Sequence, residues 1–303
     1  CHLLQDGSSL AMLTGDEGLQ RVAAVPSILS VARLSSTVVC VEVGGEALTR
    51  GAVDNVSPRC TICNYYGPTE VSIWATRREV PTDGTSKGLS SIGRPLPNVT
   101  CYIVDIESDL HSSKLQAVGM FGELWLGGAY VTRGYLNRPE KTAEVFVPQP
   151  WPGSDPSGRA ATYRTGDRAR WSLDGEIEFG GRIDFQVKLR GQRIELGEIE
   201  HALSTQPGVA EVVVLLRTDL GEPMLVAYVY PALVVGALSD GCNALPFDRV
   251  PALSAARGAL PAYMLPTLVV AVDVWPRTSS NKIDRKLLPL PVRSASVRAV
   301  ETA

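Results

Sequence analysis

The sequence has few cysteines, no long apolar run and no excess of one charge, and each lack excludes a class of protein. Six cysteines in 303 residues are too few for the disulfide framework of a small secreted domain. The apolar runs are far shorter than the ~20 residues that a membrane-spanning helix needs. A formal charge of −3, without a basic run, argues against a nucleic-acid partner. We expect a cytoplasmic protein with no membrane and no nucleic-acid partner.

A secretion leader and a zinc-ligand pattern are also absent. The first residue is Cys1, and no basic-then-apolar leader follows it, so we expect an N-terminally truncated fragment. Cys60 and Cys63 form a C-x-x-C pair, but no second Cys or His pair follows at zinc spacing. Two reduced thiols in or beside a buried strand are therefore predicted.

The first part of the chain predicts an α/β fold. Apolar spacing predicts a helix over residues 16–34, broken by Pro26. Val38–Val43 and Arg59–Tyr66 are predicted as buried strands that end in Gly-containing loops. Two such strands indicate a mostly parallel sheet, whose ligands lie beyond the carboxyl ends of the strands.

From Ile92 the pattern changes to shorter alternating strands. A helix is predicted after Leu136 with Pro139 in its first turn, and an Asp174-Gly175 hairpin turn follows later. Beyond residue 185 the order of elements predicts a separate small α+β unit. The predicted strands and helix are Thr100–Val104, Glu123–Leu126, Arg168–Trp171, Glu176–Phe179, Phe185–Leu189, Glu198–Ser204 (helix), Val209–Leu216 and Leu225–Val229.

Two strand-exit loops carry side chains suited to nucleotide chemistry. The segment Asn64–Glu70 combines aromatic rings, a Gly-Pro turn, the Thr69 hydroxyl and the Glu70 carboxylate, which could stack a purine, bind a phosphate oxygen and hold Mg²⁺. The segment Tyr163–Asp167 ends in a carboxylate that could accept hydrogen bonds from ribose hydroxyls. Alone, each segment is also compatible with an ordinary surface turn.

The segment Gly181–Glu200 is far more specific. It resembles, nearly residue for residue, the eighth core motif of the adenylation domains of nonribosomal peptide synthetases. Other motifs of that family follow in the right order across the chain. They are Gly44–Leu48, Asn64–Glu70, Gly122–Leu124 with Arg133–Leu136, Tyr163–Asp167, Leu260–Pro266 and Pro276–Arg285.

The resemblance implies the C-terminal part of an adenylate-forming (luciferase-like, acyl-CoA synthetase-like) large α/β domain, followed by a small mobile α+β domain. The implied boundaries are residues 1–181, 182–291 and a linker at 292–303. The implied reactions are formation of an aminoacyl-adenylate from an amino acid and ATP, and transfer of the acyl group to the phosphopantetheine thiol of a carrier domain. A condensation domain is a further implied partner if the chain belongs to a multimodular synthetase.

The resemblance also assigns roles to individual residues. Lys282, Thr69 and Glu70 are implied to be catalytic, with Glu70 as the ligand of Mg²⁺. Asp184 is implied to be the hinge, and Gly191 to face the pantetheine channel. The implied ATP/AMP contacts are Gly44, Asn64, Tyr66 (stacked on adenine), Asp167 (on the ribose), Phe179 and Arg182.

Alignment on the family motifs places six residues at the pocket for the amino-acid substrate: Ala23, Val41, Val43, Tyr65, Ile73 and Trp74. They are mostly apolar and carry no charge, so we expect a neutral, largely hydrophobic amino acid. Some of the six could instead be ordinary core residues.

The sequence departs from the family in one small and one large feature. Asn281 replaces the usual glycine before Lys282, and asparagine tolerates the left-handed backbone best among the other residues. More important, no Gly-rich phosphate loop is present. Two alternatives therefore stay open: an acyl- or aryl-CoA ligase of the same fold, and a non-catalytic truncated remnant.

The missing phosphate loop gives a testable expectation. The purified chain alone should not catalyse amino-acid-dependent exchange of pyrophosphate into ATP, because nothing in it would hold the β- and γ-phosphates. A longer protein with the upstream sequence restored should be active in the same assay. Measurable exchange by the isolated chain would contradict this expectation.

Overall fold

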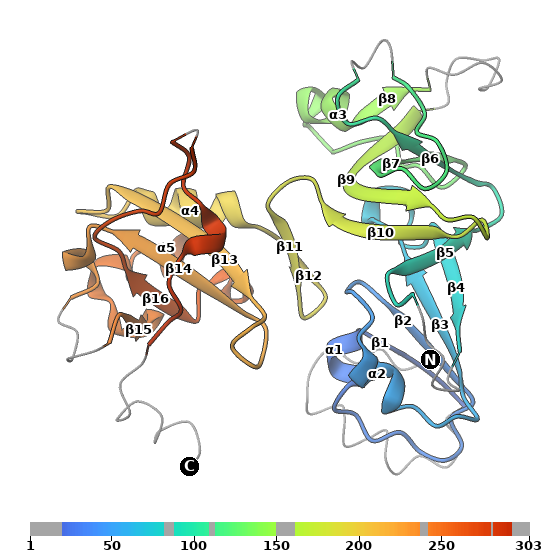
Figure 1. Cartoon of the computed structure of the whole chain (residues 1–303), viewed down its shortest axis with the longest axis horizontal. Helices are drawn as coiled ribbons and strands as arrows, with labels where there is room; N and C mark the ends of the chain where they lie inside the picture. The colour runs from blue at the N-terminus through green and yellow to red at the C-terminus, as the bar shows by residue number, and fades with distance from the viewer. Residues whose placement is uncertain are drawn as a thin grey trace. The chain divides into compact units, whose positions relative to one another are not determined.

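A computed structural model describes residues 20–81, 88–108, 113–149, 161–236, 242–279 and 281–292. The chain forms two units that divide between Asp184 and Phe185 (Figure 1). Each unit has its own hydrophobic core. The predicted domain boundary lies nearby, between residues 181 and 182, and the assignment of domains stays a prediction.

The first unit is built on one mixed sheet, in the order β1-β2-β3-β4-β5-β10-β9-β7-β6, with β8 paired to β9. Strands β1, β2 and β3 pair in parallel, and the remaining pairs are antiparallel. The strands are β1 Arg21–Ala24, β2 Cys40–Gly44, β3 Thr61–Tyr66, β4 Thr76–Val80, β5 Ser91–Pro95, β6 Val99–Val104, β7 Gly122–Gly128, β8 Phe146–Pro148, β9 Ala161–Trp171 and β10 Ile177–Arg182.

Short helices accompany this sheet: α1 Pro26–Leu29, α2 Arg50–Asp54, α3 Pro139–Val145 and the 3₁₀ turn η2 Thr69–Val71. The hydroxyl of Thr49 caps α2 by accepting a hydrogen bond from the amide of Ala52 at 3.2 Å. Residues of α1 and α2 share a core with one face of β1, β2 and β3. This packing fixes the places where β2 and β3 end.

Two predictions for the first unit were wrong. The segment predicted as a helix before Pro26 contains strand β1, because Val22 pairs with Val41 of β2 and is buried there. Pro26 begins helix α1, so a helix does restart at this break, and residues 16–19 lie outside the described residues. The parallel part of the sheet ends at β3, because β4 and β5 return as antiparallel neighbours.

The other predicted elements of the first unit are confirmed with small shifts of their ends. Strands β2, β3, β6 and β7 cover the predicted apolar runs. Pro139 occupies the first turn of α3, where a missing amide hydrogen bond costs nothing. Gly175 has a φ of +76° in the turn between β9 and β10, as the Asp-Gly pair predicted.

The second unit is an α+β unit, as predicted. A hairpin of β11 and β12 precedes α4, and a four-stranded sheet follows in the order β13-β14-β16-β15. Its elements are β11 Gln186–Leu189, β12 Gln192–Glu195, α4 Leu196–Ser204, β13 Glu211–Arg217, β14 Met224–Tyr230, η3 Ala232–Val234, β15 Ala244–Pro246, η4 Phe247–Arg249, η5 Pro251–Leu253, α5 Ala256–Ala259, η6 Ala262–Met264, β16 Leu268–Ala271 and η7 Arg285–Leu287.

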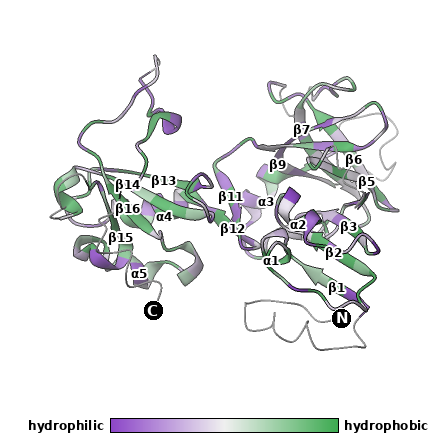
Figure 2. Ribbon diagram, turned by 60° about the horizontal axis from the view of Figure 1, so that its bottom comes forward, coloured by the Kyte–Doolittle hydropathy of each residue, from purple (hydrophilic) through white to green (hydrophobic). Residues whose placement is uncertain are grey.

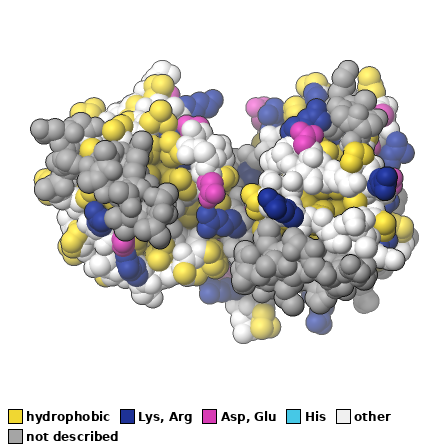
Figure 3. Space-filling view, turned by 90° about the horizontal axis from the view of Figure 1, so that it is seen from below, with side chains coloured by type: hydrophobic (Ala, Val, Ile, Leu, Met, Phe, Trp, Pro, Cys, Tyr) yellow, Lys and Arg dark blue, Asp and Glu magenta, His cyan; other side chains and the backbone are white. Residues whose placement is uncertain are grey.

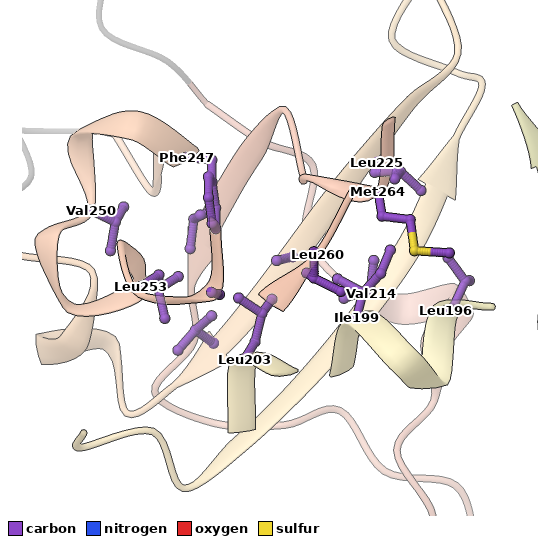
Figure 4. Close-up of a cluster of buried hydrophobic side chains, with 14 of the residues drawn as sticks. Leu196, Ile199, Leu203, Val214, Leu225, Phe247, Val250, Leu253, Leu260 and Met264 are labelled. Carbon is purple, nitrogen blue, oxygen red and sulfur yellow. The ribbon is translucent and has the colours of Figure 1, made fainter. Parts of the chain in front are cut away.

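The core of the second unit lies between α4 and this sheet. Ile199 and Leu203 stand four residues apart on one face of α4, are fully buried, and join Val214 of β13 in one cluster (Figure 4). Strands β14 and β16 are hydrophobic along most of their length (Figure 2). Burial of a leucine or isoleucine side chain stabilises a fold by about 1.5–3 kcal/mol, so this cluster is a major source of the unit's stability.

Surface charges are mixed. On the face seen in Figure 3, basic and acidic side chains are interspersed with uncharged and hydrophobic ones. Within the described parts of the chain, no helix is both long and apolar enough to cross a membrane.

Candidate functional site

The end of β3 is shaped by a tight turn at Gly67. A Cβ atom at Gly67 would lie 2.3 Å from the carbonyl oxygen of Ile73 and 2.7 Å from the amide nitrogen of Ala75. The amide of Ala75 donates a hydrogen bond to the carbonyl oxygen of Tyr66 at 2.8 Å. Only glycine allows the chain to return this closely, so Gly67 determines where the side chain of Tyr66 leaves the sheet.

Asp167 on β9 lies at the centre of the site. Its carboxylate is buried, with the residue only 5% exposed, and each of its oxygens receives a protein donor. The hydroxyl of Tyr66 donates to Oδ2, and Nη1 of Arg182 donates to Oδ1 at 3.0 Å. Burial, and then the charge of Asp167, raise the pKa of Tyr66 well above its ordinary value, so the phenol remains a donor at neutral pH.

Arg182, the last residue of β10, connects two carboxylates. Besides Asp167, it binds both oxygens of Asp184 at 2.8 and 2.5 Å. Burial alone would lower the pKa of Arg182, but hydrogen bonds and charges from Asp184 and Asp167 outweigh it and raise the pKa. The residue predicted to bind ribose and the residue predicted as the hinge therefore share one guanidinium.

Aromatic rings adjoin this carboxylate. The rings of Tyr66 and Phe179 have centroids 6.3 Å apart with their planes inclined at 43°, which is within the range of aromatic contact. Asn64 is buried on the same strand as Tyr66, and its side-chain amide donates to the carbonyl oxygen of Ser91 at 3.4 Å. Direct contacts thus join four of the predicted nucleotide-contact residues on β3, β9 and β10, namely Tyr66, Asp167, Phe179 and Arg182, and Asn64 lies on the strand of Tyr66. Asp167 lies within β9 rather than at its end.

Glu70 and Thr69 lie in η2, directly after the Gly67 turn. Glu70 is buried and accepts a 2.6 Å hydrogen bond from the hydroxyl of Tyr135, whereas Thr69 is exposed. Burial, and then Glu70, raise the pKa of Tyr135, which therefore stays a donor. Tyr135 belongs to the predicted motif Arg133–Leu136 but was not predicted as a site residue. No local sequence pattern indicates its contact with Glu70.

The backbone after Glu70 is strained. Ser72 and Ile73 both have left-handed φ angles, of +53° and +77°, and this geometry is rare for a β-branched residue. The hydroxyl of Ser72 donates to the carbonyl oxygen of Tyr130 at 2.9 Å and helps to hold this shape. Such strain persists only where surrounding contacts enforce it, and it is frequent at functional sites.

Gly44 ends β2 beside a pair of aromatic rings. A Cβ atom at Gly44 would lie 2.5 Å from the ring of Trp74 and 2.7 Å from the carbonyl oxygen of Tyr65. The rings of Tyr65 and Trp74 are in contact, with centroids 5.1 Å apart. Gly44 therefore provides the space that the Trp74 ring occupies.

The six predicted pocket residues do not share one surface. Strand register pairs Ala23 with Glu42, and Gly44 with Tyr65, which places these residues on one face of the sheet. Val41 and Val43 point to the opposite face and are buried in the core with residues of α1 and α2. Ile73 is 60% exposed.

The face that carries Ala23 and Tyr65 also carries charged residues outside the predicted pocket, among them Glu42, Arg77 and Glu79. Glu42 lies between Ala23 and Cys63 in the register, and Arg77 lies opposite Tyr65. The guanidinium of Arg77 approaches the sulfur of Cys63 at 3.0 Å. Cys60 and Cys63 are both buried free thiols, as the sequence predicted.

Lys282 belongs to the second unit and lies on a short exposed loop. The loop is closed by the pairing of Arg277 with Ile283 and by a 2.8 Å hydrogen bond from the amide of Thr278 to the carbonyl oxygen of Lys282. Asn281 has a φ of +62°, which confirms the prediction that asparagine can replace glycine here. Gly191 also has positive φ, in the exposed turn between β11 and β12.

Metal binding at this site would depend on Glu70. The described residues contain no group of three or more His, Cys, Asp or Glu side chains that could hold a metal ion. Glu70 offers a single buried carboxylate. Mg²⁺ is often held by only one or two carboxylates together with the phosphates of a nucleotide, so this residue fits that mode of binding.

Two family models match the chain in order. The family described as "AMP-binding enzyme" matches residues 9–136, and "AMP-binding enzyme C-terminal domain" matches residues 198–282. A dimodular nonribosomal peptide synthase of Bacillus subtilis is 40% identical over 84% of the chain, which covers 10% of that protein. Phosphinothricin tripeptide synthetase PhsB of Streptomyces viridochromogenes is 42% identical over 97% of the chain, which covers 24% of that protein.

A solved structure of a nonribosomal peptide synthetase protein also resembles this chain. Holo-PA1221, described as a nonribosomal peptide synthetase (NRPS) protein containing adenylation and PCP domains, superposes with a TM-score of 0.73 at 27% identity. The match covers 93% of this chain and 46% of that one. The chain therefore spans well under two thirds of the relatives that it matches. From both family models, the level of identity and the shared fold, we conclude that the chain belongs to the AMP-binding enzymes, with nonribosomal peptide synthetases among its relatives.

Proposed function

We propose that this chain is part of an enzyme domain that activates an amino acid with ATP. In the reaction the carboxylate of the amino acid attacks the α-phosphorus of ATP, the α–β phosphoanhydride bond breaks, and pyrophosphate leaves with the electron pair. The observation that carries the proposal is the buried Asp167 carboxylate of β9, held by Tyr66 and Arg182, the last residues of β3 and β10. Such a displacement is catalysed mainly by positioning and charge neutralisation.

We assign the nucleoside to this cluster. A carboxylate can accept both ribose hydroxyls, and the donors on Asp167 hold it in one orientation. Tyr66 and Phe179 offer aromatic surface for the adenine ring, and Asn64 offers an amide for its edge. When the ribose hydroxyls bind the Asp167 carboxylate, the hydrogen bond from Arg182 to this carboxylate would rearrange.

We assign the phosphates to the loop after β3. Thr69 is exposed and offers its hydroxyl to the α-phosphate, while Glu70 supplies the carboxylate for Mg²⁺. When bound, Mg²⁺ would neutralise charge on the phosphate oxygens. Glu70 and Thr69 are adjacent in η2, so they would act on the same part of the nucleotide.

We assign the second unit to charge compensation and acyl transfer. The exposed ammonium of Lys282 is suited to counter the negative charge of the substrate carboxylate and the nucleotide. Asp184 stands at the division of the units and is proposed as the hinge. The exposed Gly191 is proposed to face the pantetheine arm of a carrier domain, where a side chain would obstruct it.

The comparisons support the carrier domain as a partner. One similar solved structure is described as an NRPS protein containing adenylation and PCP domains, and another as an artificially fused adenylation–PCP di-domain NRPS. A condensation domain would be the further partner in a multimodular synthetase.

For the amino acid we propose a neutral, largely hydrophobic side chain. Ala23, Tyr65 and Trp74 supply apolar surface, and Arg77 on the same face is already paired with Glu79 at 3.5 Å. A panel of amino acids in the exchange assay of the longer protein should therefore favour neutral substrates. Preference for Asp, Glu, Lys or Arg would contradict this assignment, and preference for an acyl or aryl acid would contradict amino-acid activation itself.

Binding of AMP to the purified chain tests the nucleoside site directly. Replacement Asp167→Asn should weaken AMP binding by about 10–100-fold in calorimetry, because charge-assisted hydrogen bonds to the ribose contribute on the order of 1.5–3 kcal/mol. The matched control is Asp54→Asn at the exposed end of α2, which should leave the affinity unchanged. Equal affinity of the Asp167→Asn variant and the unmodified chain would contradict the site.

A further inference from the structure

A residue outside the loop of Glu70 holds the Glu70 carboxylate in place. The hydroxyl of Tyr135, 65 positions further along the chain, donates to Oε1 of Glu70 at 2.6 Å. A hydrogen bond to an ionised acceptor is short and strong, and it restricts rotation of the carboxylate. A carboxylate has about four acceptor sites, so accepting a hydrogen bond and binding a cation are compatible.

Two further hydrogen bonds join the same pair of segments. The amide of Thr132 donates to the backbone carbonyl of Glu70 at 2.9 Å, and the hydroxyl of Ser72 donates to the carbonyl oxygen of Tyr130. The segment 130–135 therefore fixes both the backbone and the side chain of Glu70. It also lies against the strained residues that follow Glu70.

Tyr135 is itself rigidly placed. Its amide donates to the hydroxyl of Thr142 on α3 at 2.9 Å, and its ring meets Phe146 edge-on with centroids 5.6 Å apart. Gly134 has a φ of +125°, and a Cβ atom there would lie 2.4 Å from the side chain of Thr142. Glycine at position 134 is what lets Tyr135 approach α3 and direct its hydroxyl at Glu70.

We propose that Tyr135 is a positioning residue that orients the Glu70 carboxylate for the divalent cation of the nucleotide complex. This inference rests on the proposed function, in which Glu70 is the metal ligand. Residues that hold metal ligands typically account for 10–100-fold in metal affinity. Tyr135 should thus affect metal affinity strongly and metal-free nucleoside binding little.

The test measures binding of Mn²⁺, which prefers oxygen ligands as Mg²⁺ does, to the purified chain with AMP. The electron paramagnetic resonance signal of free Mn²⁺ gives the metal affinity, and calorimetry without metal gives the affinity for AMP. Tyr135→Phe removes only the hydroxyl and should weaken Mn²⁺ binding about tenfold or more, with AMP affinity changed less than twofold. The matched control is Tyr102→Phe, whose hydroxyl accepts from Gln149 at 2.7 Å.

A double-mutant cycle with Glu70→Gln separates positioning from a general structural effect. If Tyr135 acts through Glu70, adding Tyr135→Phe to Glu70→Gln should lower Mn²⁺ affinity no further. Equal Mn²⁺ affinity in Tyr135→Phe, Tyr102→Phe and the unmodified chain would overturn the inference but leave the AMP site standing. Absence of AMP binding by the unmodified chain would instead overturn the proposed function and the inference with it.

Discussion

A buried carboxylate that accepts from two protein donors organises the first unit. Asp167 lies 101 positions beyond Tyr66, yet the two are joined by a short hydrogen bond, and Arg182 closes the group from the neighbouring strand. An unpaired buried carboxylate would be strongly destabilising, so Asp167 in β9 must stay beside Tyr66 and Arg182, the last residues of β3 and β10.

A second set of contacts depends on this arrangement. Once Tyr66 is fixed, the Gly67 turn places Glu70 beside the segment 130–135. There the hydroxyl of Tyr135 donates a hydrogen bond to the Glu70 carboxylate. Arg182 meanwhile extends from Asp167 to Asp184, the residue at which the first unit ends. The proposed ribose, metal and hinge residues are thus linked through a few short hydrogen bonds rather than standing as separate sites.

The ends of β2 and β3 could be predicted from the sequence, because glycine at the end of a buried strand lets the chain turn. The strand exit predicted at Tyr163–Asp167 was wrong, because this segment lies inside β9, which continues to Trp171. The sequence did not reveal β1, since a four-residue apolar segment becomes a strand only when a partner such as β2 is available. It also did not determine which face Val41 and Val43 occupy, because a shift of one residue moves every side chain to the other side of a strand. Nor could it reveal the contact of Tyr135 with Glu70, which no local pattern encodes.

The claim that Asp167 and Tyr66 form one coupled unit can be measured directly. A double-mutant cycle of Tyr66→Phe and Asp167→Asn would use the free energy of unfolding of the first unit, followed in the whole chain by hydrogen exchange of amides in β3 and β9. The structure predicts a coupling of about 1 kcal/mol or more, because each residue loses its partner when the other is changed. Effects that add to within about 0.3 kcal/mol would show that the two residues act independently and would contradict the account.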